Sequence, residues 1–246
     1  MVKTSAEKRI LLTARNLPKA KAPAERLKAI WPLLLDADER RLLIDSVESI
    51  ECRRGTRLFQ EGDTITSLLY LNRGKVKMFR RGIGGRLYIT RMIKPGQFFG
   101  IRPYFAHQSA QTTAEVFENA EILKVPVDVI DRLLEKNTAV ARYFLTALAT
   151  ELGLAEDRTI SLTQKHVRGR LAETLLFLMQ NYGLENDGAT LDIYLSREDL
   201  AALSNMTTSN AIRTLSLFAS ERIIALDGRI IKIIDPDGLE KISKHG

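Results

Sequence analysis

The chain has 246 residues, a formal net charge of +7 and a single cysteine, Cys52. One thiol cannot form an internal disulfide or supply a multi-cysteine metal or iron–sulfur site, which excludes those classes and favours a reducing, cytoplasmic location. No apolar run approaches the roughly 20 residues that a membrane span needs, and lysines and arginines interrupt the first 30 residues where a signal peptide would be apolar, so no membrane partner is expected.

The positive charge is concentrated at the N-terminal end. Residues 1–30 carry eight Lys or Arg and two Glu, whereas residues 167–246 carry nine Lys or Arg and 11 Asp or Glu. Residues 1–22 are therefore interpreted as a basic flexible arm, either a disordered tail or a non-specific phosphate-binding segment. The overall basicity is then no argument for nucleic-acid binding by the C-terminal region, which must be judged from individual cations.

A sensor barrel with flanking helices is predicted over residues 23–135. Apolar residues between Ala24 and Ile50 recur at helical spacing, with a break at Asp36-Ala37-Asp38 that separates two short helices. From Cys52 to Pro126, short apolar segments alternate with glycines, a pattern typical of antiparallel strands in a barrel or jelly roll.

Two glycine-containing segments of this region are interpreted as turns. Asn72-Arg73-Gly74 follows an apolar strand pattern and has the composition of a turn. Gly82-Ile83-Gly84-Gly85 is interpreted as a hairpin tip, because no helix follows that would make it a nucleotide-binding loop.

A long helix is predicted over residues 136–165, within a helical pattern that extends from Val127 to about Gln164. Its apolar positions follow alternating steps of four and three: Ala141, Leu145, Leu148, Leu152, Ala155, Thr159, Leu162 and His166. This 3.5-residue repeat is typical of a helix packed along a partner helix. A helix of about 30 residues outgrows a small barrel, so dimerisation is favoured over packing on its own domain.

Residues 166–246 predict a winged helix-turn-helix domain. Val167–Tyr182 has a helical pattern, and Leu191–Leu195 has the pattern of a short strand. Ile223–Leu226 and Arg229–Ile234 flank Asp227-Gly228, a two-residue hairpin signal that predicts the wing.

The two helices of the motif are predicted from their caps. Ser196 precedes two acidic residues and begins a short helix, Ser204-Asn205-Met206 is a tight turn, and Thr207 caps a second helix that ends near Ser220. Apolar residues expected to face inward are Leu200, Ala201 and Leu203 in the first helix, and Ala211, Ile212, Leu215 and Phe218 in the second. Two short helices joined by such a turn form a helix-turn-helix.

The second helix is expected to enter the major groove of double-stranded DNA with its N-terminal turns. The residues expected to read bases are Thr208, Ser209, Asn210 and Arg213. Arginine recognises guanine O6 and N7, and asparagine recognises adenine N6 and N7. The residues expected to contact phosphates are Arg197, Thr207, Arg229, Lys232, Lys165 and Arg168.

Residues 27–235 resemble the cyclic-AMP receptor protein/FNR (Crp/Fnr) family of bacterial transcription regulators. The resemblance lies in five segments: 59–63 (Phe59-Gln60-Glu61-Gly62-Asp63), 69–76, 96–100, 167–176 and 196–213. It implies an α+β chain with an N-terminal antiparallel jelly roll like that of cyclic-nucleotide-binding domains, a long dimerisation helix and a C-terminal winged helix-turn-helix. It also implies a homodimer on a palindromic operator, an effector pocket between barrel and long helix, and contact with RNA polymerase, here through Gly183–Ala189.

The chain departs from the family at the positions that hold cyclic AMP. Ile101 stands where the family has Glu for the ribose, and Thr112 where it has Arg for the phosphate, while Ala155 and Glu156 replace a Thr-Ser pair that contacts adenine. These changes argue against cyclic AMP as the effector. The residues expected around the pocket are Gly100, Ile101, Arg102, Tyr104, His107, Thr112, Thr113, Ala155 and Glu156. Ser209 replaces a Glu that many members use to read cytosine, which predicts an operator that differs in at least one base pair.

No cofactor or metal is assigned from the sequence. Haem is an alternative, with His107 as an axial ligand in a gas-sensing regulator, and Arg102, Tyr104 and Gln111 could instead bind a small acid. Catalysis is not expected, since no metal-ligand spacing, nucleophile elbow or phosphate loop is present. A cyclic-nucleotide-binding module without DNA function is a further alternative, and the 196–234 segment argues against it.

Overall fold

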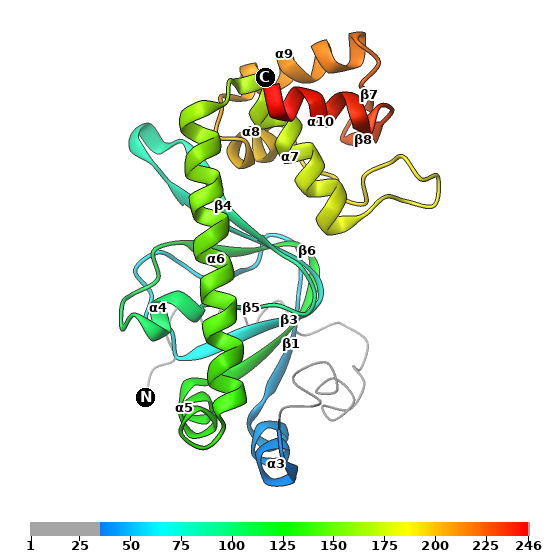
Figure 1. Cartoon of the computed structure of the whole chain (residues 1–246). Coiled ribbons are helices and arrows are strands. Elements are labelled where there is room, and N and C mark those ends of the chain that lie inside the picture. Colours follow the sequence, from blue (N-terminus) through cyan, green and yellow to red (C-terminus); the bar gives the residue numbers. More distant parts are fainter. Residues whose placement is uncertain (1–34, 246) are drawn as a thin grey trace. The chain divides into compact units, whose positions relative to one another are not determined.

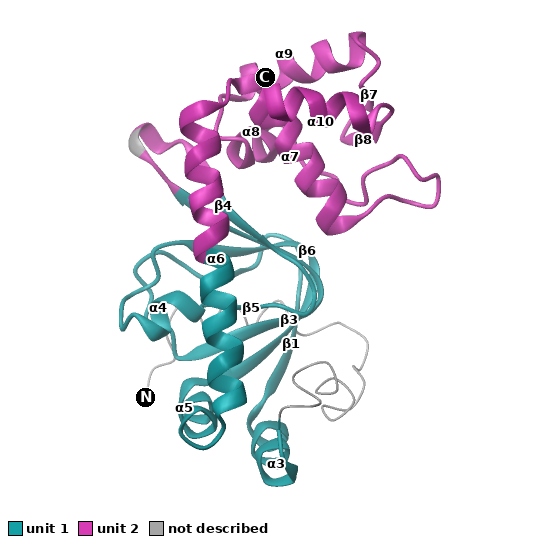
Figure 2. Cartoon of the chain, in the orientation of Figure 1, with its two compact units in different colours: residues 1–80, 90–151 teal, residues 81–89, 152–246 magenta. Residues whose placement is uncertain are grey.

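The computed structural model describes residues 35–245 (Figure 1). The predicted basic arm of residues 1–22 and the first of the two short helices lie outside the described residues. The chain forms two compact units, residues 1–80 with 90–151 and residues 81–89 with 152–246, which Figure 2 shows in teal and magenta. Each unit has its own set of buried residues and is described separately below.

The first unit is built on an antiparallel sheet, which confirms the predicted barrel-type domain. Its strands are β1 (Glu48–Cys52), β2 (Arg57–Phe59), β3 (Ser67–Arg81), β4 (Leu87–Ile93), β5 (Phe98–Phe99) and β6 (Thr113–Pro126). The strand order is β1-β6-β3-β4, with β2 paired to β6 and β5 paired to β3. Strand β6 therefore lies at the centre, and it pairs antiparallel with β1, β2 and β3.

The turn predicted at Asn72-Arg73-Gly74 is wrong, because β3 passes through these residues. The pairing of β3 with β6 shifts register several times between Leu71 and Val76, which marks an irregular, bulged stretch. Gly74 has φ +92°, and a Cβ atom added there would lie 2.4 Å from the Asn119 carbonyl oxygen. A glycine is required here for close approach of two strands and not for chain reversal.

The segment after β3 is a turn, as predicted. A short 3-10 helix spans Ile83–Gly85, and the Gly82 amide donates to the Arg86 carbonyl across 2.9 Å. Gly84 has φ +73°, a left-handed conformation that a glycine adopts without steric cost.

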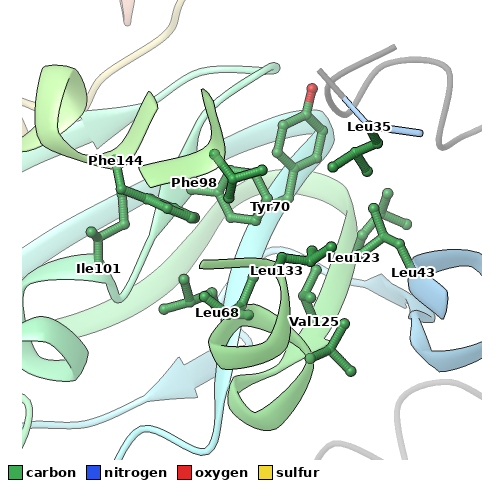
Figure 3. Close-up of a cluster of buried hydrophobic side chains, with 13 residues drawn as sticks. Leu35, Leu43, Leu68, Tyr70, Phe98, Ile101, Leu123, Val125, Leu133 and Phe144 are labelled. Carbon is green, nitrogen blue, oxygen red and sulfur yellow. The ribbon is translucent and has the colours of Figure 1, made fainter. Parts of the chain in front are cut away.

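Three shorter helices of the first unit share a buried cluster with the sheet: α3 (Ala37–Ser46), α4 (Ile101–Phe105) and α5 (Val127–Lys136). The predicted break at residues 36–38 is the start of α3, where Asp36 and Glu39 form a reciprocal capping box. Figure 3 shows the buried cluster that joins these helices to the sheet, with Phe98 from β5, Leu133 from α5 and Phe144 from the next helix.

The long helix is α6 (Thr138–Gln164), with 27 residues. The structure divides the helical stretch after Val127 in two, because Asn137 is extended and ends α5. The Asn137 side-chain oxygen accepts from the Ala139 amide across 2.9 Å and so helps α6 to begin. The predicted repeat ends at Leu162, since His166 lies outside the helix and is the N-cap of the following one.

The second unit has the winged helix-turn-helix that the sequence predicts. Its elements are α7 (Val167–Tyr182), α8 (Arg197–Leu203), α9 (Thr208–Ser220), β7 (Ile224–Asp227), β8 (Ile230–Ile233) and α10 (Pro236–His245). The strand predicted at Leu191–Leu195 is wrong: Leu191 forms an isolated bridge with Leu184, and the next residues have no regular structure. Ile193 and Leu195 are buried, so their apolar character serves the core and not a sheet.

Candidate nucleic-acid interface

The first helix of the motif begins where the sequence places its cap. The Ser196 hydroxyl oxygen accepts from the Asp199 amide across 3.0 Å, and the same hydroxyl donates to the Asp199 carboxylate across 2.7 Å. Leu200 and Ala201 are buried, as predicted, and Ala202 is buried with them, whereas Leu203 is only partly covered. The cap and the buried face together fix where α8 starts and which side it presents to the core.

The turn between α8 and α9 is held by the side chain of Arg170, from α7. Its guanidinium donates to the carbonyls of Lys165, Ser204 and Asn205 across 2.8, 3.2 and 3.3 Å. Asn205 has φ +48°, a conformation that asparagine tolerates better than most residues. The Ser204 hydroxyl also donates to the Thr174 hydroxyl across 2.9 Å in a buried pair. The three acceptors of Arg170 are backbone carbonyls, so its position in the sequence does not reveal this role.

Helix α9 presents a polar face to solvent. Thr207 caps it by accepting from the Asn210 amide across 3.2 Å. Ala211, Leu215 and Phe218 are buried as predicted, joined by Thr214, which leaves Thr208, Ser209 and Arg213 exposed. The predicted inward orientation of Ile212 is wrong, because 47% of this residue is exposed. Ile212 follows Ala211 directly, so it points about 100° away from that buried position on a helix.

The two polar residues Asn210 and Arg213 contact one another. Arg213 Nη2 donates to Asn210 Oδ1 across 2.9 Å. Asn210 is half-buried and Arg213 is exposed. The amide oxygen of Asn210 therefore helps to orient the guanidinium of the exposed Arg213.

The wing is the β7–β8 hairpin, with Gly228 in its turn in a left-handed conformation. The turn is Gly228-Arg229 and not the predicted Asp227-Gly228, because Asp227 belongs to β7 and pairs with Ile230. Arg197, at the start of α8, donates through Nη2 to the Gly228 carbonyl across 2.7 Å. Its Nη1 atom is buried and has no hydrogen-bond partner in the part of the chain that the structure describes. Burial lowers the pKa of this guanidinium. Arg197 thus ties the wing to the helix-turn-helix and keeps an unused donor.

Three of the cations expected to contact phosphates form ion pairs within the second unit. Lys232 pairs with Asp187 at 3.0 Å, and Lys165 pairs with Glu173 at 3.2 Å. Arg168 donates to Glu221 and lies 5.0 Å from the centre of the Phe218 ring, and its hydrogen bonds lower the pKa of Glu221. Such half-exposed pairs contribute at most about 1 kcal/mol, so a phosphate can replace the carboxylate at low cost. Of the two other expected cations, Arg229 is exposed in the turn of the wing, and Arg197 donates to the Gly228 carbonyl.

The residues expected around the effector pocket are placed as follows in the first unit. Gly100, with φ +82°, precedes α4, and Ile101 is buried. Arg102 donates to Gln111 Oε1 across 2.5 Å. His107 is exposed with φ +51°. The structure thus brings Arg102 and Gln111 together, two of the three residues considered for a small acid.

The remaining pocket residues differ in their surroundings. Tyr104 donates its hydroxyl to Asp131, and burial together with this hydrogen bond raises the tyrosine pKa well above its ordinary value. Thr113 Oγ1 accepts from the Glu61 amide across 3.3 Å, and Thr112 is half-buried. In the second unit, Ala155 and Glu156 are exposed on α6. Glu156 is therefore not buried within one chain. Among residues 35–245, no group of three or more His, Cys, Asp or Glu side chains is placed to hold a metal ion.

Comparison with known proteins agrees with this geometry. The family model "Cyclic nucleotide-binding domain" matches residues 49–137, and the "Crp-like helix-turn-helix domain" matches residues 169–242. The "CRP-like cAMP-activated global transcriptional regulator" of Mycobacterium tuberculosis is 25% identical over 200 residues, which cover 81% of this chain and 89% of that protein. The "Global nitrogen regulator" of Synechococcus elongatus is 24% identical over 191 residues, or 76% and 86% of the two chains.

The solved structure of FixK2 from Bradyrhizobium japonicum has the same fold. It superposes with a TM-score of 0.72 at 21% identity and covers 80% of this chain and 96% of its own. The chain belongs to the Crp/Fnr family and is a DNA-binding transcription regulator with a domain like those that bind cyclic nucleotides. Within residues 35–245, none of the helices has the length and apolar character needed to cross a membrane.

Proposed function

We propose that this regulator binds a palindromic operator as a homodimer and that its effector is not cyclic AMP. The observation that carries the proposal is the exposed polar face of α9, where Thr208, Ser209 and Arg213 extend from the first turns of a helix whose opposite face is buried. The N-terminal turns of a recognition helix meet base edges in the major groove. Arg213 supplies the bidentate donors that guanine requires, and Asn210 orients it.

A second copy of the chain is the proposed partner of α6. Leu145 and Leu152 are 67% and 62% exposed, and both lie on the 3.5-residue repeat that runs from Ala141 to Leu162. A stripe of this kind matches the seam of two helices packed side by side. Pairing along α6 would carry two copies of α9 to half-sites about one turn of DNA apart, roughly 34 Å.

The surroundings of Ile101 and Thr112 support an effector other than cyclic AMP. Ile101 is 2% exposed and Thr112 is half-buried, so neither position offers a charge or a strong acceptor to a cyclic phosphate or a ribose. An anionic phosphate taken out of water needs a cation or several donors as partners. In the same proposal, the 183–189 loop contacts RNA polymerase, and the cytoplasm is the compartment in which the regulator meets DNA.

The proposal is tested by selecting bound sequences from a random DNA pool with the full-length protein. We expect enrichment of a palindrome with half-sites one helical turn apart, and we expect Arg213→Ala to lose the preference at one base position of each half-site. Addition of cyclic AMP should leave the affinity for the enriched operator unchanged. Failure to enrich any sequence, or enrichment of the same palindrome by Arg213→Ala, would contradict operator reading by α9. Tighter binding with cyclic AMP would contradict the proposal on the effector.

A further inference from the structure

Ile212 is a large apolar side chain on the solvent-facing side of the recognition helix. It is 47% exposed, whereas its neighbours Ala211 and Leu215 are buried to within 1%. Residues three and four apart share a helix face, so Ile212 lies between Ser209 and Ser216, and Arg213 follows it directly. The side chain therefore stands within the surface proposed to meet bases.

The chemistry of an isoleucine restricts what it can face in the major groove. It has no hydrogen-bonding group, and its β-branched side chain has essentially one χ1 rotamer in a helix, so it cannot turn aside easily. A cytosine amino group or a guanine oxygen pressed against it would lose water without a new partner. The apolar feature of the major-groove base edges is the C5-methyl group of thymine. A thymine is thus the base whose edge this side chain complements.

We infer that Ile212 is a specificity-determining residue that contacts a thymine methyl group in the same half-site as the base read by Arg213. The inference rests on the proposed function, since it requires α9 to lie in the major groove. It assigns to Ile212 a selection by apolar contact, beside the selection by hydrogen bonding that Arg213 provides. It adds a determinant that the sequence pattern had placed in the core.

The test uses the operator enriched by the full-length protein, with each thymine of one half-site replaced in turn by deoxyuridine, which lacks only the methyl group. Binding is measured by fluorescence anisotropy for the wild type, Ile212→Ala, Ile212→Val and Leu217→Ala. For the wild type, one replacement should weaken binding about fourfold, as expected for one methyl group removed from an apolar contact. Ile212→Ala should bind the thymine operator more weakly and show no further loss with deoxyuridine.

The other two variants are controls. Ile212→Val keeps a branched apolar side chain and should retain most of the methyl dependence. Leu217 is also exposed, at 45%, but lies towards the other end of α9, so Leu217→Ala should respond to deoxyuridine as the wild type does. Equal losses for the wild type and Ile212→Ala at every position, or a half-site without thymine, would overturn the inference. If no operator is enriched at all, it is the proposed function that fails first.

Discussion

Arg213 Nη2 and Asn210 Oδ1 are 2.9 Å apart, so the amide of one candidate base-reading residue fixes the guanidinium of the other. We expect Arg213→Ala to lose about 1–3 kcal/mol of discrimination at one base position. Asn210→Ala should lose about 1 kcal/mol at the same position, the net contribution of one hydrogen bond. The measurement is the affinity for single-base operator variants.

The double variant decides between orientation by Asn210 and separate reading by each residue. If Asn210 acts through Arg213, the double variant should lose no more than Arg213→Ala alone. Additive losses, or a loss by Asn210→Ala at an A·T pair that Arg213→Ala leaves unaffected, would instead assign Asn210 its own base.

If the exposed leucines of α6 form the dimer seam, a charged residue at one of them should weaken dimerisation. Leu152→Glu should place two carboxylates in the paired seam and raise the dimer dissociation constant by at least about 100-fold, because a charge is costly to remove from water. Leu154, 50% exposed, points to another side of α6, so Leu154→Glu is the matched control and should stay dimeric. Sedimentation velocity over a concentration series distinguishes the two. Equal effects of both substitutions would argue against the α6 stripe as the seam.

Gly74 predicts a large loss of stability from a single methyl group. Gly74→Ala combines a left-handed backbone with a Cβ atom 2.4 Å from the Asn119 oxygen, so we expect the free energy of unfolding to fall by about 3 kcal/mol. Gly62 has a similar φ of +94° and no atom within 4 Å of an added Cβ, so Gly62→Ala should cost only about 1–2 kcal/mol. Urea denaturation measures both. Equal losses of stability would mean that β3 and β6 can move apart at position 74 without a loss of free energy.

Asp187 predicts a pH dependence in the second unit. Its carboxylate accepts from the Thr190 amide and hydroxyl, the Ala189 amide and the Lys232 ammonium, which together hold its pKa far below the usual range. A depressed pKa stabilises the fold above the unfolded-state value of about 3.9, and this contribution is lost as the pH falls towards the folded-state value. Wild type should therefore exceed Asp187→Asn in stability at pH 6, with the difference shrinking below about pH 4.

Urea unfolding of both proteins from pH 3 to pH 7 measures this difference. A difference that stays constant across the whole range would show that the contribution of Asp187 to stability does not depend on the charge of its carboxylate. A difference that grows with acidity would have the wrong sign for a carboxylate held in the ionised form.

The helix-turn-helix could be predicted from sequence because its signals are local. Ser196 and Thr207 cap helices within three residues of themselves, and the Asp227-Gly228 signal locates the hairpin to within one residue of its turn at Gly228-Arg229. Tertiary context decided the rest. The segment Asn72-Arg73-Gly74 has the composition of a turn, yet a glycine is needed at position 74 because the Asn119 carbonyl of another strand lies too close for a side chain. Ala211 and Ile212 are adjacent apolar residues, and only the packed helix shows which of them is buried.

The sequence predicted which residues form the exposed face of α9, but it did not predict which of the nearby cations form ion pairs. The exposed face of α9 contains three of the four expected base-reading residues, and the fourth, Asn210, is half-buried and accepts a hydrogen bond from Arg213. The pairing of Lys232 with Asp187 joins residues far apart in sequence, so no spacing could reveal it. Cations that the sequence alone cannot distinguish therefore differ in whether a carboxylate of the same chain already binds them.

The Arg170 guanidinium couples two backbone segments mechanically. It holds the Lys165 carbonyl, directly after α6, together with the Ser204 and Asn205 carbonyls that precede α9. If either segment moved away from the other, the half-buried guanidinium of Arg170 would lose some of its hydrogen-bond acceptors. Arg170 therefore holds the segment that follows α6 at a fixed distance from the turn that precedes α9.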